Sequence, residues 1–317
     1  MQSYHHFTLS EREYLWENYK SGKSMRGIAK ELKRSPSSIS RELKRNRNKD
    51  GSYHVWRATI LYICRRKAAK KPFRLEWDSE LAAWVAEKLR QHWSPEGIAA
   101  RWRMEHQGAR LSASTIYSAL KAGKIEGCSA VKHLRRHNKR KYTQGSKSNA
   151  VKPDRMIRDW PEEIKGRKEI GHFEGDTVYG GIGKGYLVTL VDRKSRKLHM
   201  SLVRRRSCKE TNDGILRALK GTEVRSISLD NGTEFAEFRD VEQALNIPVY
   251  FADPHAPWQR GTNENMNDIV RFFFPKGTDF TNVTEEDVAA VTDCINNRPR
   301  KCLGWLSSFE FLIHCCT

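Results

Sequence analysis

Three carboxylates are the residues of this chain best placed to do chemistry together. Asp176 lies in an expected strand, Asp230 ends another strand 54 residues later, and Glu264 opens a helix 34 residues beyond that. Clustered carboxylates supply the hard oxygen ligands that Mg²⁺ prefers, and they leave coordination positions open for phosphate and water. The pattern therefore predicts that these three residues are catalytic, hold two Mg²⁺ ions (with Mn²⁺ as a substitute) and carry out phosphodiester chemistry.

The helix that carries Glu264 also presents a cation. It belongs to the segment Pro254 to Gly277, which begins as a loop and continues as a helix from about Gly261. Arg271 follows Glu264 by seven residues, so both side chains lie on one helix face. A carboxylate and a cation aimed the same way suit a metal ion and a phosphate.

Each carboxylate also has an ordinary structural explanation. The stretch Asp230–Gly232 is a good turn by itself. Glu264 near a helix N-terminus would favour the helix dipole, and Asp176 beside Gly175 would fit a bulge. Joint placement in one strand order is much less expected by chance, which favours a shared site.

The second half of the chain has the pattern of strands and helices that is typical of an α/β fold. Segments 170–180, 185–195 and 197–205 read as strands joined by short turns, which predicts antiparallel pairing. Two later strands, 224–232 and 247–253, each follow a helix, which predicts parallel crossovers. This order is that of an α/β ribonuclease-H-like domain of the retroviral-integrase type, in which the first and fourth strands are central neighbours.

The charge of the chain is concentrated in its first half. Residues 1–150 contain 33 Lys and Arg against 13 Asp and Glu, whereas residues 151–317 contain 25 of each class. The whole net charge of +20 therefore lies in the first half. Such an excess attracts polyanions, so it predicts a nucleic-acid-binding region joined to a neutral domain. The alternative is a soluble protein with a basic surface.

Residues 8–46 read as three short helices, with a tight polar break from Lys33 to Pro36 before the last one. This is a helix-turn-helix pattern. Short hydroxyls near the start of the last helix and cations further along suit major-groove entry with phosphate contacts. The expected DNA contacts are Ser37, Ser38, Arg41, Lys44 and Arg45. The alternative is a three-helix bundle with a solvated basic face.

A second all-α region repeats the theme. The stretch 77–122 contains an amphipathic helix, then a helix with Ser94 as its cap and Pro95 at its first position, then a helix with Ser112 or Ser114 as its cap. The expected DNA contacts of that last helix are Ser114, Thr115 and Lys121. Residues 124–152 are basic and lack periodicity, which predicts a linker.

These patterns divide the chain into four parts. We expect a helix-turn-helix DNA-binding domain over residues 1–50, a second helical DNA-binding region over 51–125, a basic linker over 126–154 and a catalytic domain over 155–317. No apolar run approaches the ~20 residues of a membrane span, so no membrane partner is expected. The N-terminus lacks the apolar stretch of a signal peptide, which predicts a cytoplasmic location.

Four motifs of the second half resemble those of the DDE transposases of the IS-thirty family of bacterial insertion sequences. They are HFEGDTVYG, SLDNGTEF, WQRGTNENMNDIVRFFFPKG and NNRPRKCLGW, and the helix-turn-helix SMRGIAKELKRSPSSISRELKRN also resembles that family's. The family carries its catalytic triad on the Asp of GD, the Asp of DNG and the Glu of NEN, which here are Asp176, Asp230 and Glu264. The chain departs from the family at Phe173, usually Trp, and Gln259, usually Glu. Neither departure removes a metal ligand.

The resemblance implies a Mg²⁺-dependent DNA transposase. Its basic half would bind the terminal inverted repeats of an insertion sequence, water would cut the element end, and the freed 3′-hydroxyl would attack a phosphodiester of target DNA. Two ends must meet, so a homodimer or larger assembly on double-stranded DNA at the bacterial nucleoid is implied. The expected DNA contacts near the metals are His255, Arg260 and Arg271, with Asn263 contacting DNA or fixing the helix start.

Two other functions fit parts of the sequence. A DNA-binding regulator with a catalytically idle integrase-like domain would keep the basic half but would not need three carboxylates. An RNase-H-type nuclease would keep the carboxylates but would not need two helix-turn-helix modules. A transposase accounts for both halves.

Overall fold

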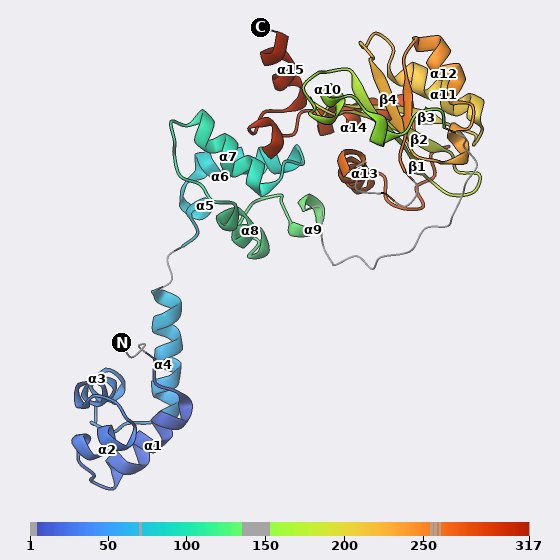
Figure 1. Cartoon of the computed structure of the whole chain (residues 1–317). Helices are drawn as coiled ribbons and strands as arrows, with labels where there is room; N and C mark the ends of the chain where they lie inside the picture. Colours follow the sequence, from blue (N-terminus) through green and yellow to red (C-terminus); the bar gives the residue numbers. More distant parts are fainter. Residues whose placement is uncertain are drawn as a thin grey trace. The chain divides into compact units, whose positions relative to one another are not determined.

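The chain folds as two compact units, Met1–Pro72 and Phe73–Thr317, in the computed structural model shown in Figure 1. The structure describes residues 5–69, 72–134, 153–253, 256, 259 and 261–316. No helix within these ranges is both long enough and apolar enough to cross a bilayer.

The described part of the N-terminal unit has four helices: α1 (Leu9–Lys20), α2 (Met25–Glu31), α3 (Pro36–Asn46) and α4 (Val55–Ala68). Thr8 caps α1 in a capping box with Glu11. Arg12 of α1 and Glu42 of α3 form a buried ion pair, with Nε and Oε1 2.8 Å apart. The apolar core of the unit includes Leu15, Ile28, Ile39, Leu43 and Ala58.

Helices α2 and α3 form the predicted helix-turn-helix. Ser35 caps α3 by accepting a hydrogen bond from the backbone N–H of Ser38, and Pro36 takes the first helical position, where no N–H partner is needed. Ile39 faces the core of the unit, and the cations of the opposite face are exposed. The helix therefore presents a basic surface to solvent while its apolar side holds it in place.

Helix α4 belongs to the N-terminal unit, so the domain boundary differs from the one expected at residue 50. It packs on α1 and α3, and its Ala58 is fully buried in the same core as Leu15 and Ile39. Burial of this apolar face attaches residues 55–68 to the helices before them and leaves the second helical region to begin near Phe73.

The second unit begins with helices α5 (Arg74–Trp77), α6 (Ser79–Arg90), α7 (Pro95–Glu105), α8 (Ala113–Lys121) and α9 (Ala130–His133). Ser94 and Ser112 cap α7 and α8, as the sequence predicts. Apolar side chains of these helices form one core, which includes Leu81, Val85, Leu89, Ile98 and Ile116. Helix α9 lies inside the stretch expected to be a linker, and residues 135–152 of that stretch lie outside the described residues.

Five described strands form one sheet in the order β3-β2-β1-β4-β5. The strands are β1 (His172–Tyr179), β2 (Tyr186–Asp192), β3 (Leu198–Val203), β4 (Ser226–Leu229) and β5 (Val249–Phe251). Strands β1, β2 and β3 pair in antiparallel fashion, whereas β4 runs parallel to β1 and β5 runs parallel to β4. The predicted strand order and directions are confirmed, and the sheet with its helices is the ribonuclease-H-like fold.

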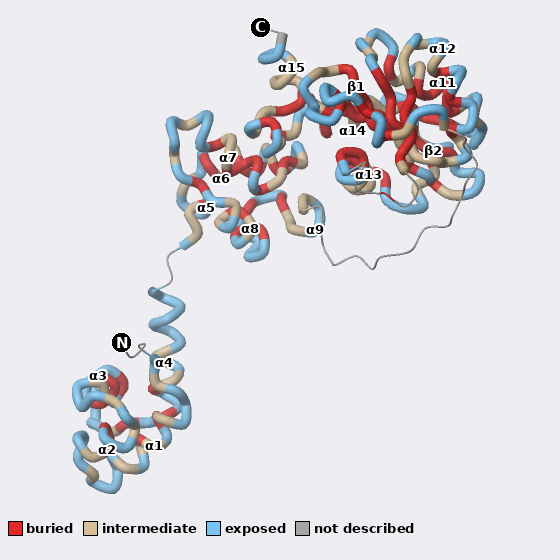
Figure 2. Tube along the Cα trace, viewed as in Figure 1, coloured by how far each residue is buried: buried red, intermediate tan, exposed pale blue. Residues whose placement is uncertain are grey.

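Helices cover both faces of this sheet (Figure 1). α11 (Cys208–Ala218) and α12 (Phe238–Leu245) cover one face, and α13 (Gly261–Phe273) and α14 (Glu285–Asn296) cover the other. Figure 2 shows the buried strands between the two layers. Val178 of β1 packs in the α13 core, so Asp176 and Glu174, two and four residues earlier, point to the same side of the sheet.

The remaining described elements connect these layers. They are η1 (Ile157–Asp159), α10 (Glu162–Lys165), η2 (Thr233–Phe235), η4 (Lys301–Leu303) and α15 (Ser308–Cys316). Glu310 of α15 accepts two hydrogen bonds from Arg101 of α7, at 2.9 and 2.8 Å. His92, just before α7, lies edge-on to Phe273 of α13. The helices after Phe73 are therefore packed against the sheet domain within one unit.

Candidate active site

The register of the sheet brings Asp176 and Asp230 to neighbouring positions. β1 and β4 pair in parallel, with Glu174 opposite Ser228. Asp176 lies two residues further along β1, and Asp230 lies just beyond the end of β4, two residues after Ser228, so this register puts them next to each other on strands ~4.8 Å apart. Their separation of 54 residues in the sequence is the same as the offset between the paired strands.

Gly175 does not mark a bulge. The β1–β2 ladder pairs its residues one to one from Phe173 to Tyr179, with Gly175 opposite Leu190. A Cβ at this glycine would lie 2.7 Å from Cδ2 of Leu229, so the residue permits close packing between neighbouring strands. The bulge explanation for Asp176 is therefore wrong, and Asp176 lies within a regular strand.

Asp176 contacts the helix that carries Glu264. Its Oδ2 accepts a hydrogen bond from Nδ2 of Asn267 in α13 (2.8 Å), and Oδ1 of Asn267 accepts one from the hydroxyl of Thr189 in β2 (3.1 Å). Glu264 precedes Asn267 by three residues, so the two lie about one helical turn apart. The amide of Asn267 thus holds this part of α13 against β1 and β2.

A turn holds Asp230 at the end of β4. Its Oδ1 accepts a hydrogen bond from the backbone N–H of Gly232 (3.0 Å), and Nδ2 of Asn231 donates to the carbonyl oxygen of Ala252 beyond β5 (2.9 Å). Residues Asp230–Gly232 therefore form the turn that their sequence favours. It also fixes the position of Asp230 beside Asp176, so the turn and a catalytic role are compatible.

Glu264 lies in the first turn of α13, as the sequence predicts, and its side chain is exposed. Within the described part of the chain, no group of three or more His, Cys, Asp or Glu side chains lies close enough to hold a metal ion. The structure therefore carries Asp176 and Asp230 on paired strands and Glu264 on α13, and the three carboxylates do not form a ready metal-binding group among the described residues.

A buried acid that the sequence reasoning missed lies on the same strand face as Asp176. Glu174 is fully buried, and its Oε2 accepts a hydrogen bond from the backbone N–H of Asn263 (3.1 Å). The carboxylate thus faces the unpaired N–H groups and the positive dipole at the start of α13. Glu174 thereby fixes the helix turn that carries Glu264. Its position in the sequence could have revealed it, because residues two apart in a strand point to the same face and Glu174 precedes Asp176 by two.

Arg193 completes this buried cluster. Its Nε lies 3.7 Å from Oε1 of Glu174, and its guanidinium lies 3.8 Å from the ring centroid of Trp160. Burial lowers the pKa of Arg193 to about 10; Glu174 opposes this shift, and neighbouring Arg167 and Arg196 add to it. The pair therefore anchors the end of β2, the start of α13 and the segment before β1 to one another.

Asn263 is fully buried, so the prediction that its side chain contacts DNA is wrong. It belongs to the inward stripe of α13 with Thr262 and Met266, which packs toward the sheet. The alternative prediction, that Asn263 fixes the helix start, fits its backbone hydrogen bond to Glu174.

Arg271 lies two turns along α13 from Glu264, as expected. Its Nη2 donates a hydrogen bond to the carbonyl oxygen of Tyr179, the last residue of β1 (2.8 Å). The guanidinium is therefore held at the end of the strand that carries Asp176. The two remaining cationic residues predicted here, His255 and Arg260, lie outside the described residues.

Glu234 is a further acid near the strand ends that the sequence reasoning missed. It accepts hydrogen bonds from the hydroxyl of Thr177 and from Nη2 of Arg206, each at 3.0 Å. Burial would raise the pKa of Glu234, but hydrogen bonds from its own backbone N–H, Arg206 and Thr177 hold that pKa below its usual value. Glu234 stays ionised and ties the segment after Asp230 to β1.

The hydroxyls expected to contact DNA in the two helical regions lie at the starts of α3 and α8, and the two helix starts have the same arrangement of hydroxyl groups. In α3, the hydroxyls of Ser37 and Ser38 lie 3.0 and 2.9 Å from that of the cap Ser35. In α8, the hydroxyls of Ser114 and Thr115 each lie 2.8 Å from that of the cap Ser112. The exposed cations that follow are Arg41, Lys44 and Arg45 in α3 and Lys121 in α8.

The two departures from the family pattern both have structural partners. Phe173 is buried in the core between the sheet and α11. The side-chain amide of Gln259 exchanges two hydrogen bonds with Asp253, one with its backbone N–H and one with its carboxylate, each at 2.8 Å. Both residues therefore serve local packing and leave the carboxylates in place.

Comparisons with known proteins agree with this geometry. Residues 3–46 match a family model described as a helix-turn-helix domain, and residues 166–257 match one described as an integrase core domain. The transposase InsI of insertion sequence element IS30A from Escherichia coli (strain K12) is 34% identical over 97% of this chain and 83% of its own length. The chain belongs to the IS30, or IS-thirty, transposase family.

Other members of the family are similar over the same extent. The transposase of element IS1086 from Cupriavidus metallidurans is 33% identical over 91% of this chain and 88% of its own length. The transposase of element IS4351 from Bacteroides fragilis is 32% identical over 96% of this chain and 94% of its own length. This IS30-family chain is a DNA-binding DDE transposase, a polynucleotidyl transferase of a class that depends on a divalent metal ion.

The chemistry of the donor set suits such an ion. Asp176 within β1 and Asp230 just beyond the adjacent β4 offer hard carboxylate oxygens, and exposed Glu264 offers another from α13. The lack of His and Cys among these three favours Mg²⁺ or Mn²⁺ over softer metals.

Proposed function

We propose that this transposase binds the terminal inverted repeats of its insertion sequence, cuts the element ends and joins them to target DNA. Asp176, Asp230 and Glu264 are the proposed catalytic residues. The observation that carries this proposal is the strand register, in which Asp176 of β1 is next to Asp230 just beyond β4. Family membership supports the class of reaction, and the register supports this choice of residues.

The three carboxylates would hold two Mg²⁺ ions, for which Mn²⁺ could substitute. When bound, such ions lower the pKa of water and stabilise the oxygens that attack and leave phosphorus. The chain's own residues position this chemistry. Asn267 orients the carboxylate of Asp176, Glu174 fixes the start of α13, and Arg271 offers a cation to a phosphate at the end of β1.

The helix-turn-helix regions would read the inverted repeats. The start of α3 and the start of α8 each carry three neighbouring hydroxyls. Three exposed cations follow in α3 and one, Lys121, follows in α8. Hydroxyls and cations in this order suit phosphate and base-edge contacts in the major groove. Two such modules, one over residues 5–69 and one over residues 73–134, would read a longer site than either alone.

Two element ends must be brought together, so we infer a homodimer or larger assembly on double-stranded DNA. Because its substrate is the bacterial chromosome and the element within it, we expect the protein at the nucleoid in the cytoplasm.

The test of the carboxylate assignment is Asp230→Asn. Loss of the charge removes a metal ligand, so cleavage and strand joining should fall by at least about 10³-fold, while binding to the element ends persists. Asp240→Asn, at an exposed position of α12, is a matched control that should leave both catalysis and end binding unchanged. Cleavage activity that survives Asp230→Asn would disprove the assignment.

A substrate comparison separates this function from a ribonuclease-H-type nuclease. A transposase should cut duplex DNA that carries the element ends and leave an RNA–DNA hybrid of the same sequence intact. Preferential cleavage of the hybrid would contradict the proposed substrate.

A further inference from the structure

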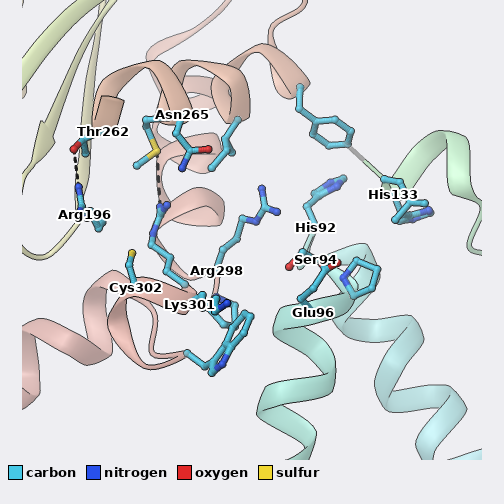
Figure 3. Close-up of a pocket in the computed structure, with 18 of the residues that line it drawn as sticks. His92, Ser94, Glu96, His133, Arg196, Thr262, Asn265, Arg298, Lys301 and Cys302 are labelled. Carbon is cyan, nitrogen blue, oxygen red and sulfur yellow. Dashed lines mark hydrogen bonds between the residues drawn. The ribbon is translucent and has the colours of Figure 1, made fainter. Parts of the chain in front are cut away.

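A cavity of about 770 Å³ lies between the helices after Phe73 and the sheet domain. It is bordered by the start of α13, by the loop after α14 and by the residues just before and within α7. Figure 3 shows Thr262 and Arg196 at one side, His92 and His133 at the other, and Arg298 extending between them.

The cavity is strongly cationic. Five arginine and lysine residues line it against one acid, Glu96, whose Oε1 accepts a hydrogen bond from the hydroxyl of Tyr117 (2.9 Å). The five cations are Arg167, Arg196, Arg298, Arg300 and Lys301. Within the described residues, Arg167, Arg196 and Lys301 form no ion pair with an acid. The cavity therefore holds more positive charge than the protein itself neutralises.

Two like charges lie close together at one side of the cavity. Arg196 and Arg167 both donate to the single hydroxyl of Thr262, at 2.6 and 3.2 Å. Burial lowers the pKa of Arg167 and the charge of Arg196 lowers it further, while Glu174 opposes the shift. Across the cavity, burial, His133 and Arg298 lower the pKa of His92, which favours its neutral form. An anion bound beside Arg167 and Arg196 would relieve the repulsion between them.

Aromatic rings complete the lining. His92 and His133 are stacked with centroids 6.3 Å apart, and His92 meets the edge of Phe272 at 5.4 Å. Tyr117 and Trp305 also line the cavity. Rings beside cations are the combination by which proteins hold unpaired nucleotides, because bases stack on rings while phosphates meet the cations.

We propose that this cavity binds one or two unpaired nucleotides at the end of a DNA strand. Its volume falls in the ~300–1,000 Å³ range of sites for small ligands, which admits a mononucleotide or a dinucleotide and excludes a duplex. Gly261, Thr262 and Asn265 of α13 line it, so a strand seated here lies next to the helix that carries Glu264. The inference rests on the proposed strand-cleaving function, whose substrate it specifies.

The experiment compares two DNA probes in the absence of metal ions. One is a blunt duplex, and the other is the same duplex extended at one 3′ end by two unpaired thymidines. Fluorescence anisotropy on the full chain in EDTA should show roughly tenfold tighter binding of the extended probe, from the added stacking and phosphate contacts. Lys301→Gln and Arg196→Gln should each remove most of this preference, and Lys220→Gln, an exposed cation outside the cavity, should retain it.

Taking the ratio of the two affinities cancels the contribution of the helix-turn-helix regions, which both probes share. Equal binding of both probes by the unmodified protein, or a preference that survives both cavity variants, would overturn the proposal. Loss of the preference in Lys220→Gln would also overturn it, because the effect would then reflect overall charge. Since Lys301 is exposed, its variant should fold even if Arg196→Gln does not.

A second measurement locates the bound strand. Replacing the unpaired thymidines with iodouracil and irradiating the complex should cross-link the probe to Tyr117, Trp305, His92 or His133, as mapped by mass spectrometry. A cross-link confined to the N-terminal unit would contradict the proposed site. Neither measurement depends on catalysis, so failure here is distinguishable from failure of the carboxylate assignment.

Discussion

At the scale of single residues, the buried ion pair of Glu174 and Arg193 contributes more to the stability of the fold than an exposed acid does. Both side chains are buried, and the carboxylate also accepts a backbone N–H at the start of α13. Removing one member of a buried pair leaves the other charge without compensation, which costs far more than breaking an exposed pair.

We therefore expect Glu174→Gln to lower the free energy of unfolding by about 3 kcal/mol, as measured by urea denaturation. Glu162→Gln is the matched control, because Glu162 is exposed and its pair with Lys165 spans 3.4 Å; it should change stability by less than about 0.5 kcal/mol. Equal effects of the two variants would show that Glu174 contributes no more than a surface acid.

His199 gives the sheet domain a dependence on pH. Burial and the charge of Lys197 lower the pKa of His199 from its usual 6.5, while its Nδ1 donates to the carbonyl oxygen of Ala218 (3.0 Å). The folded protein therefore binds fewer protons at this site than the unfolded chain does. This contribution to stability is complete above the unfolded pKa and is lost as the pH falls through the lowered one.

Lowering the pH from about 7.5 to about 5 should therefore lower the Tm, and His199→Gln, which keeps an amide donor but does not titrate, should lose less Tm over this interval. Thermal melts of both proteins across the interval measure the difference. His5→Gln, on an exposed residue, should melt like the unmodified chain. Identical pH profiles for His199→Gln and the unmodified chain would exclude His199 as the cause.

At the scale of elements, α13 is positioned by polar contacts at its start and one turn later. Glu174 accepts a hydrogen bond from its N-terminus, and Asn267 bridges Asp176 of β1 and Thr189 of β2. Its apolar residues Met266, Ile269 and Val270 hold the helix on the sheet, but apolar packing alone tolerates small slides. The polar contacts fix which residues of the helix face the strand ends.

Asn267→Ala should accordingly lower the rate of strand cleavage by about ten- to a hundredfold, the range found for residues that orient metal ligands. Binding to the element ends should be unchanged, because Asn267 lies on the sheet side of α13. Asn282→Ala, outside α13 and on an exposed position, is the control. Full activity in Asn267→Ala would show that the carboxylate of Asp176 needs no orientation from the helix.

At the scale of the whole molecule, a basic N-terminal half is joined to a neutral sheet domain. The charge difference between the halves amounts to the entire net charge of +20. Affinity for DNA from such a surface arises from release of counterions, so it falls with salt in proportion to the number of phosphates contacted.

Arg41→Gln, on exposed α3, should weaken duplex binding at every sequence tested and should reduce the slope of log K against log salt by about 0.9. Titrations at several salt concentrations measure this slope. Lys276→Gln, an exposed cation of the sheet domain, should leave the slope unchanged. A reduction in affinity without a change in slope would show that Arg41 contacts no phosphate.

The secondary structure and its order follow from local sequence signals. The cap residues Ser94 and Ser112 mark their helix starts correctly, because a hydroxyl that accepts a backbone N–H acts within three residues. The strand order also follows from the sequence, because short turns impose antiparallel pairing and helical crossovers impose parallel pairing. The placement of α4 could not be predicted, since it depends on which distant core buries Ala58.

For this protein, the sequence by itself determined the elements, the charge asymmetry and the three carboxylates with their motifs, because each of these is encoded in neighbouring residues. Only the tertiary structure decided that Asp176 stands beside Asp230, that Asn263 is buried, and that Glu174 meets the start of α13. It also decided that cations from three separate segments line one cavity. These features depend on contacts between residues tens to hundreds of positions apart, and packing and strand register fix such contacts.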